Sequence, residues 1–286
     1  MGKEEVAIMI CVDNLCYQYK NGIRVLKDIS FSIDKGEFVA LIGRNGSGKT
    51  TLLKHLNGLL KPTQGRVTVN GLDTSNTKTS LLAKHVGFLF QNPDHQIFCS
   101  TVYDEIAFGL KNTGVNSNDI DRLVTRSARR VGIEQCLELN PFSLSKGQRQ
   151  RVALASVLAM ETEILVLDEP TTGQDYKEGI EIMEIIKDLN CSGKTVIMVT
   201  HDMELVARYA RRVIILQDGT VLEDGQTKSV LGKTEKLALA NLQPPQIYML
   251  ARKFHKNGMF KNVYTVEEMY EEIISYLEGE VNVCNG

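Results

Sequence analysis

The chain has 286 residues, of which 43% are hydrophobic and 24% are charged, and its formal net charge at pH 7 is -2. A chain of this length can bury one large core, or one α/β domain with a smaller appendage. The composition is too apolar for a disordered chain and lacks the basic excess that favours nucleic acid. No apolar run is long enough to span a bilayer and no secretory signal opens the sequence, so we expect a cytoplasmic protein.

Strand-like runs dominate the first third of the chain. They are short, rich in β-branched and aromatic residues and bounded by turn signals, and they cover residues 8–12, 25–33, 37–42, 66–70 and 86–90. The run at 37–42 leads directly into a glycine-rich segment. Residues 51–58 then have helical spacing and stop at Gly58, with Pro62 beyond. A strand, a glycine-rich loop and a helix therefore follow one another.

The remainder of the chain begins with a helical segment and then alternates. Residues 102–133 have helical spacing with a polar break at 112–118, which predicts a mostly helical insertion. Beyond it we expect helices over residues 146–160, 176–189 and 203–210, and strands over 164–167, 195–199 and 213–216. This alternation predicts a mainly parallel sheet with helices on both faces. From about residue 230 the pattern is helical only, and Thr265 to Glu268 form a capping box.

The glycine-rich segment fits the P-loop motif G-x-x-x-x-G-K-[ST]. It consists of Gly43, Arg44, Asn45, Gly46, Ser47, Gly48, Lys49 and Thr50. Its position after an apolar strand and before a helix is the context that the motif requires. Backbone N–H groups and the helix N-terminus would hold the phosphates of ATP, with Thr51 included in the site. We expect Lys49 to reach the β- and γ-phosphates and Thr50 to bind Mg²⁺.

A second motif places two carboxylates at the end of an apolar strand. Residues 164–167 are followed by Asp168 and Glu169. Open α/β sheets bind ligands at the carboxyl ends of their strands. Asp168 is suited to the Mg²⁺ shell, and Glu169 to activating the attacking water as a general base. An acidic pair alone is usually a solvated turn, but a P-loop in the same chain favours the catalytic interpretation.

A third motif resembles the signature sequence of the ATP-binding cassette (ABC) ATPases. It consists of Leu144-Ser145-Lys146-Gly147-Gln148, followed by residues 149–155, and lies just before the acidic strand. Ser145 and the backbone N–H groups of Gly147 and Gln148 open a helix, whose N-terminus attracts phosphate. The resemblance implies that this helix completes the ATP site of a second subunit, so that two cassettes enclose two nucleotides head to tail. Lys146 departs from the family, which most often has glycine there.

The resemblance also implies an architecture. It is an α/β P-loop NTPase core with a mainly parallel sheet, an N-terminal antiparallel β-subdomain and a helical subdomain that carries the signature. On this basis we expect an ABC nucleotide-binding domain over residues 5–229, with its helical subdomain at about 92–160. Residues 230–286 would form a small C-terminal helical extension.

Further positions match the family one by one. Tyr19 resembles the aromatic residue that stacks on adenine, and Tyr17 is close enough to compete for this role. Gln91, directly after the strand at 86–90, resembles the glutamine that senses Mg²⁺ and the attacking water. Asp175 matches the loop that communicates across the dimer. His201 resembles the switch histidine that contacts the γ-phosphate, and we count it with Glu169, Gln91 and Lys49 among the catalytic residues.

The segment from Gln91 to Gly109 is similar to the ATPases of energy-coupling factor (ECF) importers, which take up vitamins or transition-metal cations. The C-terminal helices, which follow Pro244-Pro245, also resemble the domain that helps to hold the two ATPases of that group together. Independently, a dense apolar set lies in this segment: Ile97, Phe98, Val102, Ile106 and Phe108. If part of it is exposed, it offers a groove for an amphipathic partner helix, whereas all of it could equally be core.

These features lead to the hypothesis of a peripheral ATPase on the cytoplasmic face of the membrane. Its expected partners are a second ABC ATPase, identical or different, a transmembrane scaffold subunit and a substrate-binding membrane subunit. The resemblance implies that the membrane subunit chooses the transported compound. Other ABC transporters, exporters included, share the same motifs, and the Gln91 to Gly109 segment separates them from ECF importers. A soluble ABC protein of translation or DNA repair would normally carry two cassettes or a long coiled coil.

Overall fold

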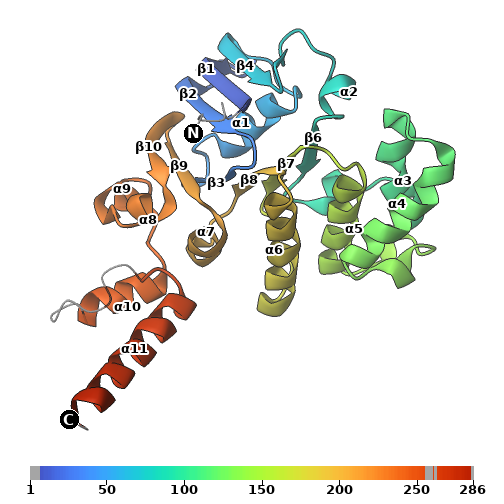
Figure 1. Ribbon diagram of the computed structural model, residues 1–286. Helices are drawn as coiled ribbons and strands as arrows, with labels where there is room; N and C mark the ends of the chain where they lie inside the picture. The colour runs from blue at the N-terminus through green and yellow to red at the C-terminus, as the bar shows by residue number, and fades with distance from the viewer. Residues whose placement is uncertain (1–6, 255–259, 261–262, 285–286) are drawn as a thin grey trace, which may run out of the picture.

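The computed structural model describes residues 7–254, 260 and 263–284, and two sheets organise them (Figure 1). The larger sheet has the strand order β10-β9-β3-β8-β7-β6. Its neighbours from β9 to β6 pair in parallel, and β10 is an antiparallel edge strand. The strands are β3 (Phe38–Ile42), β6 (Val86–Leu89), β7 (Ile164–Asp168), β8 (Thr195–Val199), β9 (Arg212–Gln217) and β10 (Thr220–Gln226).

The smaller sheet lies beside the first helix and is antiparallel, with the order β2-β1-β4-β5. Its strands are β1 (Ile8–Gln18), β2 (Arg24–Asp34), β4 (Gln64–Val69) and β5 (Leu72–Asp73). The mainly parallel sheet and the N-terminal antiparallel sheet expected from the sequence are therefore both confirmed. The large sheet's apolar side chains on one face share a buried core with this smaller sheet.

The three central strands β3, β8 and β7 are buried at every residue. Continuous apolar runs of this kind suit parallel strands that are covered on both faces. Because these strands are parallel, their carboxyl ends lie at one edge of the sheet. Gly43 follows β3 there, Glu169 follows β7, and Thr200 and His201 follow β8. The fold therefore brings together segments that are far apart in the sequence.

The helices divide into a group at the sheet and a separate helical subdomain. The first group comprises α1 (Lys49–Leu56), the short α2 (Thr79–Leu82), α6 (Tyr176–Cys191) and α7 (Met203–Tyr209). The second comprises α3 (Val102–Thr113), α4 (Ser117–Arg130) and α5 (Lys146–Ala159), at the right of Figure 1. Short 3-10 turns precede and join these helices at η1 (Pro93–His95), η2 (Glu134–Cys136) and η3 (Pro141–Ser143). The polar break predicted at 112–118 falls at the turn between α3 and α4.

The C-terminal residues form α8 (Thr227–Leu231), α9 (Thr234–Leu239), α10 (Gln246–Phe254) and α11 (Val266–Cys284). Figure 1 shows α10 and α11 projecting away from the sheets. Helices α8 and α9 instead bury Val230, Leu231 and Leu237 in the main core. The predicted capping box is present, because the Glu268 N–H donates to the Thr265 hydroxyl and the Thr265 N–H donates to the Glu268 carboxylate. The helix that it opens is α11.

Three small elements had no sequence signal. Strand β5 and helix α2 are each too short to show a period, and β10 is an edge strand of mixed polarity with no buried residue. Edge strands lack the continuous apolar run that marked the central ones. Across the part of the chain that the structure describes, no helix has both the length and the apolar character needed to cross a membrane.

Candidate active site

The P-loop lies between the end of β3 and the start of α1, and close contacts explain why glycine occupies two of its positions. Gly43 has a φ of 151°, and a Cβ there would lie 2.2 Å from the backbone oxygen of Leu216. Gly48 has a φ of 104°, and its Cβ would meet a methyl group of Leu26 at 2.8 Å. Side chains at these positions would therefore displace the neighbouring strands. Glycine keeps the loop backbone close enough to the sheet to curve around a ligand.

Lys49 and the beginning of α1 face the inside of this curve. The Lys49 ammonium donates to the backbone oxygens of Gly43 at 2.6 Å and Arg44 at 3.0 Å. Burial lowers the pKa of Lys49, while the negative charges of Glu169 and Asp168 act in the opposite direction. No side chain among the described residues caps the N-terminus of α1. Its first N–H groups are consequently available to an anion, and the helix dipole favours one.

A cavity of about 410 Å³ lies over the P-loop. It is lined by Asn45, Gly46, Gly48, Lys49, Thr50 and Thr51 from the loop and α1, by Gln91, Asp168 and Glu169, and by Val25 and Val199. The hydroxyl of Ser47 is buried nearby with no hydrogen-bond partner in the described residues. The orphan hydroxyl, the uncapped helix and the glycine cradle all fit a phosphate chain. The motif residues from three separate segments therefore meet at one cavity.

Thr50 and Asp168 form the part of this cavity that suits Mg²⁺. The Thr50 hydroxyl donates to the Asp168 carboxylate at 2.9 Å. Burial raises the pKa of Asp168, and the Thr50 hydrogen bond and the Lys49 charge oppose that shift. A divalent cation would compensate the same buried negative charge. Among the described residues, no group of three or more His, Cys, Asp or Glu side chains is placed to hold a metal ion.

Glu169 and His201 lie side by side at the ends of β7 and β8. Glu169 has a φ of 53°, in the left-handed region that non-glycine residues rarely adopt, and its N–H donates to the Val199 oxygen at 2.9 Å. Its carboxylate lies 2.9 Å from Nδ1 of His201. The Glu169 side chain is mostly buried, whereas that of His201 is 84% exposed. The carboxylate thus has a fixed orientation, and the imidazole faces outward.

Two tyrosines, Tyr17 and Tyr19, lie beside α1. The Tyr19 hydroxyl is 3.1 Å from the hydroxyl of Thr51, so Tyr19 contacts the P-loop helix directly. Tyr17 packs edge to face between Tyr19 and His55, and burial raises its pKa. Tyr19 is the more accessible ring, which favours it as the adenine-stacking residue. This role stays a prediction.

The signature residues lie at the start of α5, apart from the P-loop cavity. Ser145 and Gln148 form a capping box: the Gln148 N–H donates to the Ser145 hydroxyl at 3.2 Å, and the Ser145 N–H donates to the Gln148 side chain at 3.0 Å. Ser145, Gly147 and Gln148 do not line the cavity over the P-loop. One chain therefore does not bring its own signature residues to its own P-loop.

A second cavity, of about 370 Å³, adjoins Glu169 on the other side. The loop 171–175, Glu169 and His201 line it. Asp175 ends this loop as the N-cap of α6, where its carboxylate accepts from the Glu178 N–H at 2.8 Å. Asp175 thereby has a structural role in helix capping. The communication across a dimer that the family resemblance implies for it stays a prediction.

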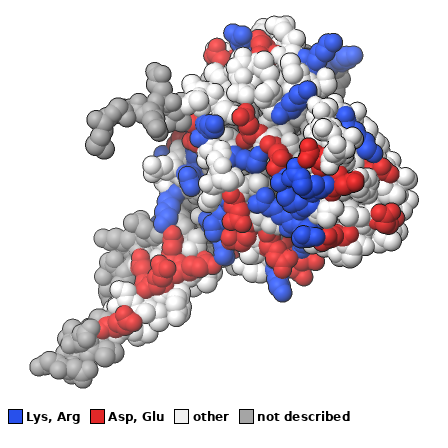
Figure 2. All heavy atoms as spheres, turned by 45° about the vertical axis from the view of Figure 1, so that its right-hand side comes forward, with Lys and Arg blue, Asp and Glu red and all other residues white. Residues whose placement is uncertain are grey.

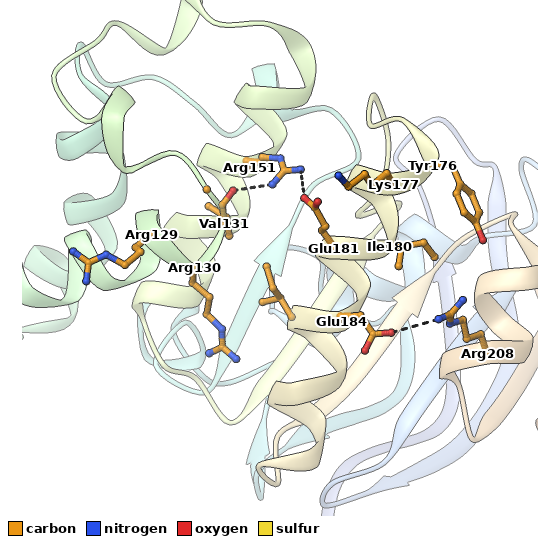
Figure 3. A pocket seen from close by; sticks show the side chains of 12 residues that line it. Arg129, Arg130, Val131, Arg151, Tyr176, Lys177, Ile180, Glu181, Glu184 and Arg208 are labelled. Carbon is orange, nitrogen blue, oxygen red and sulfur yellow. Dashed lines mark hydrogen bonds and ion pairs between the residues drawn. The ribbon is translucent and has the colours of Figure 1, made fainter. Parts of the chain in front are cut away.

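A third cavity, of about 790 Å³, contains none of the residues predicted from motifs. It lies between α4 and α5 on one side and α6 and α7 on the other (Figure 3). Its two carboxylates already have partners, because Glu181 pairs with Arg151 at 3.2 Å and Glu184 with Arg208 at 3.9 Å. Figure 2 shows Lys and Arg gathered near the middle of one face of the molecule, with Asp and Glu beside them. Both ion pairs join neighbouring helices, α5 to α6 and α7 to α6.

Val25 and Val199 are the lining residues of the P-loop cavity that sequence reasoning missed. Each is one apolar residue in a β-rich run, and nothing distinguishes it there from its neighbours that point into the core. The Arg44 side chain lies 4.0 Å from Asp218 in an exposed ion pair, and the assignment of Arg44 to the site, which concerns the loop backbone, stays a prediction. The motif selects a stretch of backbone, and the direction of each side chain follows from the fold.

The fold and the cavity over the P-loop together define a P-loop nucleotide-binding protein. A family model described as ABC transporter matches residues 26–172. An energy-coupling factor transporter ATP-binding protein of Caldanaerobacter subterraneus subsp. tengcongensis is 43% identical, over 96% of this chain and 99% of its own length. The chain therefore belongs to the ABC family, and ECF transporter ATP-binding proteins are among its relatives.

Solved structures of ATP-binding cassettes superpose on this chain. The structure of cbiO1 from Clostridium perfringens, part of the ABC transporter complex cbiONQ, superposes with a TM-score of 0.72 at 36% identity, covering 86% of this chain and 99% of that one. A dimeric ATP-binding cassette bound to ADP and Pi superposes with a TM-score of 0.72 at 32% identity, covering 77% of this chain and 99% of that one. The chain also matches ABC transporter ATP-binding proteins at 42% to 46% identity, but it spans less than half of their length.

Proposed function

We propose that this chain is the ATP-hydrolysing subunit of an ECF-type importer for a vitamin or a transition-metal cation. The single observation that carries the proposal is the cavity at which the P-loop, Gln91, Asp168 and Glu169 meet. The ECF transporter relatives, which match nearly the whole chain, support the particular type of importer. Other ABC transporters remain the alternative, since the cavity itself suits any member of the family.

Hydrolysis would proceed from residues that already have suitable positions. The P-loop N–H groups and Lys49 would bind the β- and γ-phosphates. Thr50 and Asp168, with Gln91 nearby, would hold Mg²⁺, which neutralises phosphate charge when bound. Glu169 would accept a proton from the attacking water, and its hydrogen bond to His201 would orient the carboxylate. His201, which is largely exposed, would also reach the γ-phosphate.

The separation between the P-loop and the signature helix supports a dimer as the active unit. Ser145, Gly147 and Gln148 do not line the P-loop cavity of their own chain. In the proposed enzyme they would meet the nucleotide of a second cassette, which can be identical or different. ATP binding would then close the dimer, and hydrolysis would release it. The solved dimeric cassette with ADP and Pi is consistent with this cycle.

An apolar groove beside the helical subdomain would dock the transmembrane scaffold subunit. Of the apolar set in this segment, Ile97, Val102 and Ile106 are buried, whereas Phe98 is 60% and Phe108 45% exposed. The two exposed rings contact each other edge to face, with their centroids 4.7 Å apart. They line a cavity of about 450 Å³ together with Leu59, Phe88, Phe90 and Met160. A groove with this lining suits an amphipathic helix.

The C-terminal extension would help to hold the two cassettes together. Helix α11 leaves Val266, Tyr270 and Leu277 largely exposed, an apolar set on a helix that projects from the body. Exposed apolar side chains in this number indicate contact with another surface.

As the ATPase of such an importer, the chain would be a peripheral protein at the cytoplasmic face of the membrane. A substrate-binding membrane subunit would select the transported compound.

The proposal is tested by purifying the tagged full-length chain from its source cells in mild detergent. We expect membrane subunits to co-purify with it, and the preparation to hydrolyse ATP only when Mg²⁺ is present. Recovery of the chain free of membrane subunits, at an expression level matched to the natural one, would contradict the transport function. Hydrolysis that is indifferent to Mg²⁺ would contradict the assignment of the cavity.

A further inference from the structure

A short loop, residues 170–175, joins Glu169 at the end of β7 to the first residue of α6. Gln174 in this loop forms hydrogen bonds across to α5. Its side-chain amide donates to the backbone oxygen of Gly147 at 2.8 Å, and its side-chain oxygen accepts from Arg151 at 3.3 Å. Gln174 therefore connects the loop that follows Glu169 to the first turns of the signature helix.

The contact between this loop and α5 is close-packed. A Cβ on Gly147 would lie 2.8 Å from the backbone oxygen of Gly173 and 3.1 Å from the Gln174 amide nitrogen. On the other face of the contact, a Cβ on Gly173 would lie 3.4 Å from Cγ of Lys146. The backbones of the loop and of α5 are therefore packed against each other with no space between them. The first turn of α5 cannot approach the loop further without displacing it.

Arg151 fixes the far side of the same junction. Its side chain is only 11% exposed. Its guanidinium donates to the backbone oxygen of Val131 at 2.9 Å and to the Glu181 carboxylate at 3.2 Å, as Figure 3 shows. Arg151 thus joins α5 to the end of α4 and to α6. The Gln174 side chain is held between this arginine and Gly147, which defines its position.

The loop is also tied to Glu169. The Thr172 N–H donates to the Glu169 backbone oxygen at 3.2 Å, and the Gln174 N–H donates to the Thr171 oxygen at 3.2 Å. Glu169 itself has a left-handed backbone, which persists only when its surroundings hold it. A shift of the loop would therefore change the direction of the Glu169 carboxylate.

We infer that Gln174 is a positioning residue that couples the first turn of α5 to the general base Glu169 within one chain. The inference rests on the proposed function, in which that first turn of α5 binds the nucleotide of the second cassette. Nucleotide bound at the ATP site of one cassette would then affect, through Gln174, the general base at the other ATP site. Gln174 touches neither nucleotide and acts only through its contacts to Gly147 and Arg151.

The test compares Gln174→Ala and Gln174→Glu with the wild-type full-length chain in steady-state ATP hydrolysis. Alanine removes both hydrogen bonds. Glutamate keeps an acceptor for Arg151 but cannot donate to Gly147, so it isolates the bond to the signature helix. We expect both variants to lower kcat by about threefold to tenfold, as for one lost hydrogen bond. We also expect both to lower the Hill coefficient for ATP towards 1, with KM and the melting temperature close to wild type.

Gln135→Ala is the matched control, because the Gln135 amide also donates to a glycine oxygen, that of Gly132, but far from the loop in sequence. It should retain wild-type kcat and cooperativity. Wild-type kcat and cooperativity in Gln174→Glu would overturn the inference, and so would a loss of ATP binding in either Gln174 variant. Failure of the proposed function would look different, because the wild-type chain itself would then lack hydrolysis or cooperativity.

Discussion

At the scale of single residues, the candidate site depends on three residues whose surroundings strain the backbone or shift the pKa of the side chain. Glu169 has a backbone conformation that costs about 1 kcal/mol for a non-glycine residue. Asp168 is buried, and this raises its pKa. Lys49 is partly desolvated beside both of them. Such perturbed and strained groups concentrate at functional sites, and here they adjoin one cavity.

The role of Glu169 can be tested with Glu169→Gln, which keeps the size and the strand end but removes the basic oxygen. We expect kcat for ATP hydrolysis to fall by on the order of a hundredfold or more, because a general base contributes that much. ATP binding should stay within a few-fold of wild type, since the phosphate cradle is unchanged. Steady-state hydrolysis and equilibrium binding of Mg²⁺-ATP measure the two effects.

Glu163→Gln provides the control for that substitution. Glu163 directly precedes the same strand at its opposite end, where it accepts from Asn70 at the surface. This variant should hydrolyse ATP at the wild-type rate. Near-normal turnover by Glu169→Gln would falsify the assignment of the base.

At the scale of elements, the sequence predicted what is periodic or continuous and missed what depends on tertiary contacts. Strands β3, β7 and β8 were predicted because each is a continuous apolar run, and the structure buries every residue of them. Edge strand β10 gave no such signal. The P-loop and the acidic pair were found because each is a local motif in a defined context.

The contact between Gln174 and Gly147 could not be predicted, because these residues are 27 positions apart and glutamine carries no pattern of its own. The apolar set near α3 shows the same limit. Ile97 and Phe98 are adjacent in the chain, yet Ile97 is 3% exposed and Phe98 60% exposed. Composition identified the set, whereas only packing against α3 and α5 decides which members face outward.

The groove itself yields a prediction. The double variant Phe98→Ser, Phe108→Ser removes the pair of exposed rings that lines the groove. We expect at least a tenfold loss of the membrane subunits that co-purify with the chain, since central aromatic residues typically dominate an interface. Hydrolysis by the isolated chain should change little, because neither ring lines the P-loop cavity.

Leu239→Ser is the control for the groove, as Leu239 is similarly exposed at 58% but lies on α9. It should co-purify with the membrane subunits as the wild type does. Undiminished co-purification by the double phenylalanine variant would show that the scaffold docks elsewhere.

At the scale of the whole molecule, the proposed function assigns to the chain two separate halves of a nucleotide site. The P-loop, Asp168 and Glu169 would form one half at the sheet, and the first turn of α5 would form the other on the helical subdomain. The loop after Glu169 contacts that turn through the hydrogen bond from Gln174 to Gly147. An enzyme built from such halves would need a second cassette, and we propose that the exposed apolar residues of α11 contact it.

The most direct measurement of this claim is complementation between Lys49→Ala, which lacks the phosphate-binding lysine, and Ser145→Arg, which blocks the signature helix. We expect each variant alone to be inactive and Ser143→Arg, a nearby control, to be active. Mixing the two inactive variants should restore up to about a quarter of wild-type hydrolysis, because half of the dimers would contain one intact site of the two. Wild-type hydrolysis by Ser145→Arg alone would contradict a site shared between two chains.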